Sequence, residues 1–148
     1  MKKTTLSAML VILTLVLSGN AFALCVENEY ANLRSGPGTN YAKTWEVYRY
    51  MPFQEVSKKG AWYKVKDVDG DLHWIFGRLV TNSYKCAVVK NEKANVRTGP
   101  GTNYKQTDYS PVLRYYSFKV MKIDGDWVNV IDQDGDKGWI YKPLLWIP

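Results

Sequence analysis

The sequence predicts an all-β protein built from two tandem copies of one small domain. One segment of the chain recurs farther along it, and short apolar stretches alternate with turn residues in each copy. Outside the first 23 residues no stretch of helical periodicity is long enough to matter. The 148 residues are 46% hydrophobic and 23% charged, which is globular composition and excludes a disordered or fibrous chain.

The N-terminal segment has the features of a secretory signal peptide. Lys2 and Lys3 precede an apolar run, residues 6–17, and a small-x-small site ends at Ala23. The run is shorter than the roughly 18 residues of a membrane span, so cleavage is favoured over an uncleaved anchor. We therefore predict a signal peptide over 1–23 and export to the periplasm or the extracellular space. We expect no membrane span after cleavage, and Leu24 before Cys25 argues against lipid attachment.

Export places Cys25 and Cys86, the two cysteines, in an oxidising compartment, where we expect them to form a disulfide. The bridge would close a loop of about 60 residues and stabilise the fold by about 4 kcal/mol. The alternative is that Cys25 is a nucleophile with His73 as its base. Because the chain has one histidine, few such arrangements are open, and the bridge is favoured.

The repeat begins with an eleven-residue segment that occurs twice with nine identical positions. ANLRSGPGTNY at 31–41 corresponds to ANVRTGPGTNY at 94–104, an offset of 63. The offset becomes 65 farther on, where Trp62 corresponds to Trp127. We assign copy one to 24–83 and copy two to 84–148, and this division leaves no room for a catalytic domain.

Each copy contains a predicted hairpin. Residues 62–66 and 72–76 flank Asp69-Gly70, and residues 127–131 and 137–141 flank Asp134-Gly135 in the same way. Strand alternation puts Trp62 and Trp127 on the face opposite the valines, so these tryptophans should be partly exposed. The two Gly-Pro-Gly segments are interpreted as turns, because proline presets φ and the flanking glycines tolerate positive φ.

These motifs resemble the bacterial SH3 domains. Copy two contains the patterns NVRTGPGTNY at 95–104, GDWVNV at 125–130 and GWI at 138–140. Copy one departs where His73 replaces the glycine before Trp74. The resemblance covers about 30–80 and 93–145 and implies two SH3-like β-barrels in series. It also implies a binding or targeting role, since such domains are often attached to peptidoglycan hydrolases and bind wall peptide or glycan.

We therefore hypothesise a non-catalytic exported module that recognises cell-envelope material, with a peptidoglycan peptide or glycan as its ligand. The alternative is a periplasmic adaptor that docks another exported protein or a peptide in an aromatic groove. A hydrolase that uses Cys25, Cys86 or His73 is the weakest hypothesis. No cofactor or metal is expected. The net charge of +6 is dispersed among many acidic residues, which does not indicate a nucleic-acid partner.

The candidate ligand contacts are aromatic side chains near the turns, because rings offer large and rigid contact area to a peptide or a sugar. They are Tyr41, Trp45, Trp62 and Trp74 in copy one and Tyr104, Tyr109, Trp127 and Trp139 in copy two, with Tyr50, Tyr115 and Tyr116 as further candidates. The alternative is that most of these rings complete two small cores.

Two other patterns have a structural interpretation that we favour. Arg34 and Arg97 could bind a ligand carboxylate, but hydrogen bonds to carbonyls around the Gly-Pro-Gly turns are the simpler role. The aspartate-rich segments 67–71 and 132–136 lack the glycine and glutamate spacing of an EF-hand calcium loop. Turn formation explains these aspartates.

Overall fold

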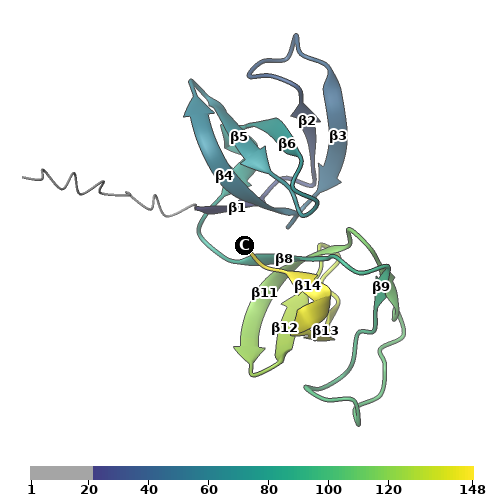
Figure 1. The fold of residues 1–148 in the computed structure, drawn as a ribbon. Coiled ribbons are helices and arrows are strands. Elements are labelled where there is room, and N and C mark those ends of the chain that lie inside the picture. Colours follow the sequence, from purple (N-terminus) through teal and green to yellow (C-terminus); the bar gives the residue numbers. More distant parts are fainter. Residues whose placement is uncertain (1–21) are drawn as a thin grey trace, which may run out of the picture.

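The computed structural model describes residues 22–148, so most of the predicted signal peptide lies outside the described residues. Within this range the protein is all-β, with two short 3-10 turns and no α-helix, as predicted (Figure 1). The predicted cleavage site, Ala23, is the first residue of β1. None of the elements in 22–148 is a helix long and apolar enough to cross a membrane.

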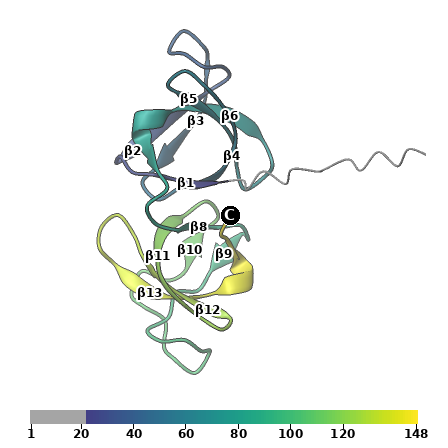
Figure 2. The same ribbon diagram turned by 90° about the vertical axis from the view of Figure 1, so that its left-hand side faces the viewer.

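Copy one forms a seven-stranded antiparallel sheet that curls around its core (Figures 1 and 2). Its strands are β1 (Ala23–Val26), β2 (Tyr30–Arg34), β3 (Lys43–Tyr48), β4 (Pro52–Lys59), β5 (Trp62–Lys66), β6 (Leu72–Phe76) and β7 (Val80–Thr81). The spatial order is β3-β2-β6-β5-β4-β1-β7. A 3-10 turn, Gly77–Leu79, joins β6 to β7.

Copy two repeats this arrangement with a shorter first hairpin. Its strands are β8 (Cys86–Val89), β9 (Lys93–Ala94), β10 (Val112–Leu113), β11 (Ser117–Asp124), β12 (Trp127–Ile131), β13 (Lys137–Tyr141) and β14 (Leu145–Trp146). Five strands form one sheet, in the order β13-β12-β11-β8-β14, and β9 pairs with β10 separately. The 3-10 turn Lys142–Leu144 precedes β14. The Val96 amide donates to Ser110 Oγ at 2.9 Å, so a side chain replaces a backbone carbonyl as the acceptor where the hairpin of β9 and β10 is interrupted.

Both predicted hairpins are confirmed. β5 and β6 pair in register from Trp62↔Phe76 to Lys66↔Leu72, and β12 and β13 pair from Trp127↔Tyr141 to Ile131↔Lys137. The turn glycines Gly70 and Gly135 have φ of 87° and 90°, a region that only glycine adopts at little cost. The alternation is also as predicted, since the valines of β5 and β12 are buried and the two tryptophans are half-buried.

The Gly-Pro-Gly segments form turns, but the reason predicted for their glycines was wrong. The Gly38 amide donates to the carbonyl of Gly36 at 2.9 Å, and copy two repeats this bond. None of these four glycines has positive φ. A Cβ atom on Gly36 would overlap the ring of Tyr41, and one on Gly99 would overlap the ring of Tyr104. Glycine is therefore required because a tyrosine packs directly on the turn backbone.

Each copy has its own hydrophobic core. Phe53, fully buried in β4, lies in the first core, and Phe118, fully buried in β11, lies in the second. Two residues of copy two reach the core of copy one: Val88 on β8 is buried in it, and Trp146 on β14 packs against it. The two cores are thus separate, but burial of Val88 couples the copies.

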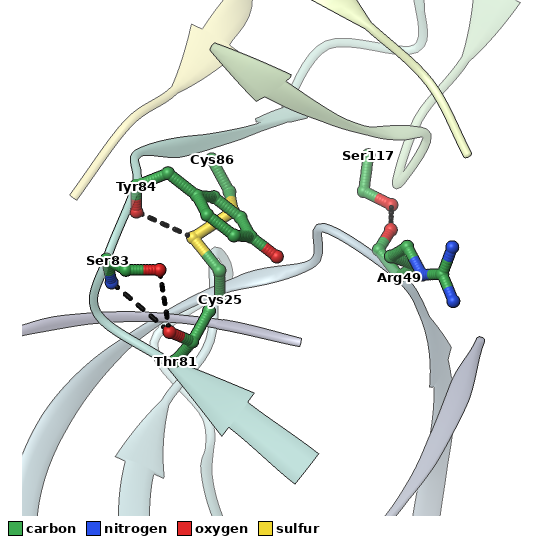
Figure 3. The surroundings of a disulfide bond; sticks show 7 residues. All are labelled: Cys25, Arg49, Thr81, Ser83, Tyr84, Cys86 and Ser117. Carbon is green, nitrogen blue, oxygen red and sulfur yellow. Dashed lines mark hydrogen bonds between the residues drawn. A yellow bond between two sulfur atoms is a disulfide. The ribbon is translucent and has the colours of Figure 1, made fainter. Parts of the chain in front are cut away.

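The predicted disulfide is confirmed, and it joins the two copies. Cys25 on β1 bonds to Cys86 on β8, with Cα atoms 5.9 Å apart and a sequence separation of 61 (Figure 3). Figure 3 also shows Ser117 beside Arg49, where the serine hydroxyl donates to the arginine carbonyl at 2.8 Å. Because both cysteines are in the bridge, the alternative of a Cys25 nucleophile was wrong.

Candidate functional site

An aromatic and cationic strip runs across the outer face of copy one. In the β5–β6 hairpin Trp62 lies opposite Phe76 and Lys64 lies opposite Trp74, and Trp74 also pairs with Arg34 of β2. Residues that are directly opposite on neighbouring strands share a face of the sheet. The rings of Trp62 and Phe76 are tilted against each other with centroids 5.5 Å apart. Sheet register thus gathers two of the predicted tryptophans beside an arginine.

Copy two carries the equivalent strip. Trp127 lies opposite Tyr141, with ring centroids 5.7 Å apart, and Asn129 lies opposite Trp139. Arg97 forms a β-bridge with Trp139, as Arg34 pairs with Trp74 in copy one. The strip is therefore duplicated with two changes of chemistry, because Tyr141 replaces Phe76 and Asn129 replaces Lys64.

In copy one the strip borders a cavity of about 740 Å³, which we call the first-copy groove. Tyr30, Asn32 and Arg34 of β2 line it together with Trp62 and Phe76. The side-chain oxygen of Asn32 is buried there, and no group of residues 22–148 donates a hydrogen bond to it. A buried acceptor without a donor is unfavourable, and an O–H or N–H group of a ligand would satisfy it. Rings, an amide and a guanidinium together suit a sugar or a peptide.

The arginines at the edge of each strip also hold the Gly-Pro-Gly turns. Arg34 Nη1 donates to the Tyr41 carbonyl at 3.0 Å, and Arg97 Nη1 donates to the Tyr104 carbonyl at 2.9 Å and to the Thr102 carbonyl at 3.3 Å. The favoured structural interpretation of these arginines is confirmed. Tyr41 and Tyr104 lie on the same turns, each with 43% of its surface exposed.

The remaining two predicted contacts lie away from the strips. Trp45 on β3 packs against the first core and meets the ring of Tyr115 edge-on, with centroids 5.3 Å apart, where the two copies touch. Tyr109 packs against the second core, and its buried hydroxyl has no hydrogen-bond partner in the described part of the chain. Burial raises the pKa of Tyr109 to about 12. The eight predicted residues thus occupy three different environments rather than one site.

The aspartate-rich segments close the hairpin turns, as predicted. Asp67 Oδ1 accepts the amides of Asp69 and Asp71 at 3.0 and 2.9 Å. The other oxygen, Oδ2, lies 2.9 Å from His73 Nε2, which donates because a carboxylate only accepts. Thr44 Oγ1 lies 2.8 Å from the other ring nitrogen. Among residues 22–148 no group of three or more His, Cys, Asp or Glu side chains is arranged to hold a metal ion.

Sequence reasoning missed Tyr30, Asn32 and Phe76, which line the first-copy groove. The predicted contacts are aromatic residues near turns, so an amide within a strand is not among them. The signal was available, because β2 alternates buried Ala31 and Leu33 with outward-facing Tyr30, Asn32 and Arg34. The pairing of β2 with β6 could not be predicted from the sequence. This pairing brings the outward-facing side chains of β2 beside the β5–β6 hairpin.

Comparison with known proteins agrees with the duplicated fold. The family model for the bacterial SH3 domain matches residues 27–81 and 90–146. Over 66 residues, 45% of the chain, the sequence is 36% identical to the putative N-acetylmuramoyl-L-alanine amidase YrvJ of Bacillus subtilis (strain 168). The chain spans 12% of the length of that relative.

Two solved structures are similar over most of the chain. An NlpC/P60 family protein from Bacillus cereus ATCC 10987 is 16% identical with a TM-score of 0.37, over 85% of this chain and 56% of that one. The CBD of endolysin LysPBC5 is 13% identical with a TM-score of 0.35, over 86% of this chain and 93% of that one.

Proposed function

Because the chain belongs to the bacterial SH3 domain family, we propose that it is an exported, non-catalytic binding module whose ligand is peptidoglycan. The family match occurs twice, once in each copy. The Bacillus subtilis relative is named as a putative N-acetylmuramoyl-L-alanine amidase, and that compound joins an amino sugar to an amino acid. The Cys25–Cys86 bridge supports an oxidising compartment outside the cytoplasm.

The duplicated aromatic strip is the observation that carries this proposal. In the first-copy groove the rings of Trp62 and Phe76 offer an apolar surface to a sugar ring or a peptide side chain. Arg34 and Asn32 provide polar partners on the opposite wall. Two such strips on one disulfide-linked chain would bind a polymer in which the ligand repeats more tightly than either strip alone.

The side chains considered for hydrolysis have structural partners. Cys25 and Cys86 are bonded to each other, and His73 is held between Asp67 and Thr44. This supports binding without catalysis.

Co-sedimentation with purified sacculi tests the proposal. The protein should pellet with sacculi at moderate salt, and Trp62→Ala should weaken binding by about tenfold or more, as is typical for a truncated aromatic anchor. Trp127→Ala tests the strip of copy two in the same way. Met121→Ala is the control, because Met121 is exposed on β11, a strand that contributes no residue to either strip.

Recovery of all the protein in the supernatant would reject peptidoglycan as the ligand. Crosslinking in the intact envelope would then test the adaptor hypothesis, which requires one stoichiometric protein partner.

A further inference from the structure

A second cavity lies between the two copies, and we call it the interdomain cleft. It measures about 420 Å³. Trp45, Arg49 and Met51 line it from copy one, and Arg114, Tyr115 and Gln133 line it from copy two. The cleft is distinct from the first-copy groove, which lies on β2, β5 and β6.

The charge of the interdomain cleft is positive. Its charged lining residues are Glu46, Arg49 and Arg114, and Glu46 is paired with Lys43 at 3.0 Å. No carboxylate of the part of the chain that the structure describes lies within ion-pair distance of either arginine. Arg49 Nε donates to the Glu27 carbonyl at 2.9 Å, which orients the guanidinium and leaves its terminal nitrogens for other partners.

The backbone after each arginine is strained in the same way. Tyr50 and Tyr115, which follow Arg49 and Arg114, have φ of 71° and 72°. Each is the third residue of a turn, closed by the hydrogen bond of Met51 N–H to the Tyr48 carbonyl or of Tyr116 N–H to the Leu113 carbonyl. Glycine is usual at such a position, and a bulky side chain there is sterically unfavourable. The same backbone turn therefore follows Arg49 and Arg114, the two arginines that line the cleft.

The walls of the cleft are also fixed before any ligand binds. Tyr115 meets Trp45 edge-on and donates its hydroxyl hydrogen to Asp69 Oδ2 at 2.8 Å, across the boundary between the copies. Ser117 donates to the Arg49 carbonyl, and the Cys25–Cys86 bridge joins β1 of copy one to β8 of copy two (Figure 3). A preformed site binds more tightly because less conformational entropy is lost on binding.

We propose that the interdomain cleft binds an acidic peptide, with carboxylates on Arg49 and Arg114 and its aliphatic part against Trp45 and Tyr115. Two guanidinium groups without carboxylate partners match two carboxylates, each through paired N–H donors. Gln133 and Ser117 offer neutral hydrogen-bonding groups beside them. This inference rests on the proposed function, under which the acidic peptide is the stem peptide of peptidoglycan.

Titration of the isotope-labelled protein with L-alanyl-γ-D-glutamyl-diaminopimelate, followed by NMR, tests this inference. We expect shifts of the Trp45 indole and of the Arg49 and Arg114 Nε–H signals. Arg114→Gln should weaken binding at least tenfold, since a hydrogen bond to a charged group contributes about 1.5–3 kcal/mol. Arg78→Gln removes the same charge from an exposed 3-10 turn and should change binding less than twofold. The same peptide with amidated carboxylates should not bind.

The outcomes separate the cleft from the function. Shifts at Trp62 and Phe76 that Arg114→Gln leaves unchanged would overturn the cleft assignment, and so would the absence of any shift. Co-sedimentation with sacculi is measured on the same protein samples, so that the two proposals can be separated. If the wild type pellets and the peptide does not enter the cleft, the proposed function stands and this inference fails. If the wild type stays in the supernatant, the proposed function itself fails.

Discussion

In both copies a buried aspartate closes the β5–β6 or β12–β13 turn, but the two aspartates have different donors on their second oxygen. Asp67 and Asp132 each accept two turn amides on Oδ1. Asp67 Oδ2 is bound by His73 from the next strand. Asp132 Oδ2 instead accepts the hydroxyl of Tyr116, at 2.9 Å, from the turn before β11. The donors thus come from different elements of the repeat.

The exchange shows how a duplicated fold accommodates a change at one position. At an offset of 65, His73 corresponds to Gly138 and Met51 corresponds to Tyr116, so each copy has one donor. The space beside Gly138 is filled in copy two. A Cβ atom there would overlap Val96 and lie 3.0 Å from the Tyr109 hydroxyl. Copy one thus has His73 as the donor to its turn aspartate, in place of the tyrosine hydroxyl that serves this role in copy two.

Breaking the disulfide between the copies should cause the largest loss of stability. It tests whether the two copies stay folded without the covalent link between them. In the chain-entropy model, a loop of about 60 residues is worth about 4 kcal/mol. Reduction should lower the free energy of unfolding by about this amount in urea titrations with and without reductant. The Cys25→Ala/Cys86→Ala variant should be insensitive to reductant. A loss under about 1 kcal/mol on reduction would show that burial of Val88 and the other contacts between the copies suffice.

His73 and Gly138 occupy equivalent positions, and placing each residue in the other copy should lower the free energy of unfolding by different amounts. Gly138→His should lower the free energy of unfolding by about 3 kcal/mol, because the side chain meets Val96 and the Arg97 carbonyl in a filled space. His73→Gly should cost about 2 kcal/mol, because a buried carboxylate oxygen loses its donor and a strand gains a glycine.

Urea titration measures both losses. The control is Lys137→His, one residue away on β13 and exposed, which should stay within about 0.5 kcal/mol of the wild type. Equal losses for Gly138→His and Lys137→His would contradict the packing argument.

The fold was predictable because its signals are local or repeated. The Asp-Gly turns and the alternation of buried and exposed residues in 62–66 and 127–131 predicted the two hairpins. The internal repeat showed that a hairpin found in one copy should also be present in the other. The disulfide followed from the compartment and from there being two cysteines. That the disulfide joins the two copies did not follow, because strand order β4-β1-β7 and the position of β8 depend on long-range packing.

The candidate site was predictable only in part. Trp62, Trp74, Trp127 and Trp139 lie on the duplicated strip, since parity along a strand determines the face. Trp45 on β3 instead contacts Tyr115 of copy two, and Tyr109, which lies in a turn, packs against the second core. The left-handed φ of Tyr50 and Tyr115 carries no sequence signal, because glycine is the residue expected there.

The smallest expected effect concerns alkaline pH and should be concentrated in copy two. Burial and the hydrogen bond to Asp132 raise the pKa of Tyr116, and burial raises the pKa of Tyr109 to about 12. Copy one has Met51 where copy two has Tyr116. A raised pKa in the folded state means that the unfolded chain loses its phenolic protons first, near pH 10.

The free energy of unfolding should therefore be unaffected by these groups below pH 10 and fall as the pH rises from 10 to 12. Tyr116→Phe should cost about 1 kcal/mol at pH 7, through the lost hydrogen bond to Asp132, and should make the fall above pH 10 shallower. Tyr141→Phe is the matched control, because Tyr141 is exposed on the outer strip and should leave the slope unchanged. Urea titrations at pH 7, 9, 10 and 11 measure the slopes. A slope unchanged in Tyr116→Phe would mean that the Asp132–Tyr116 bond does not persist in solution, and copy two would then lack the donor that makes it comparable with copy one.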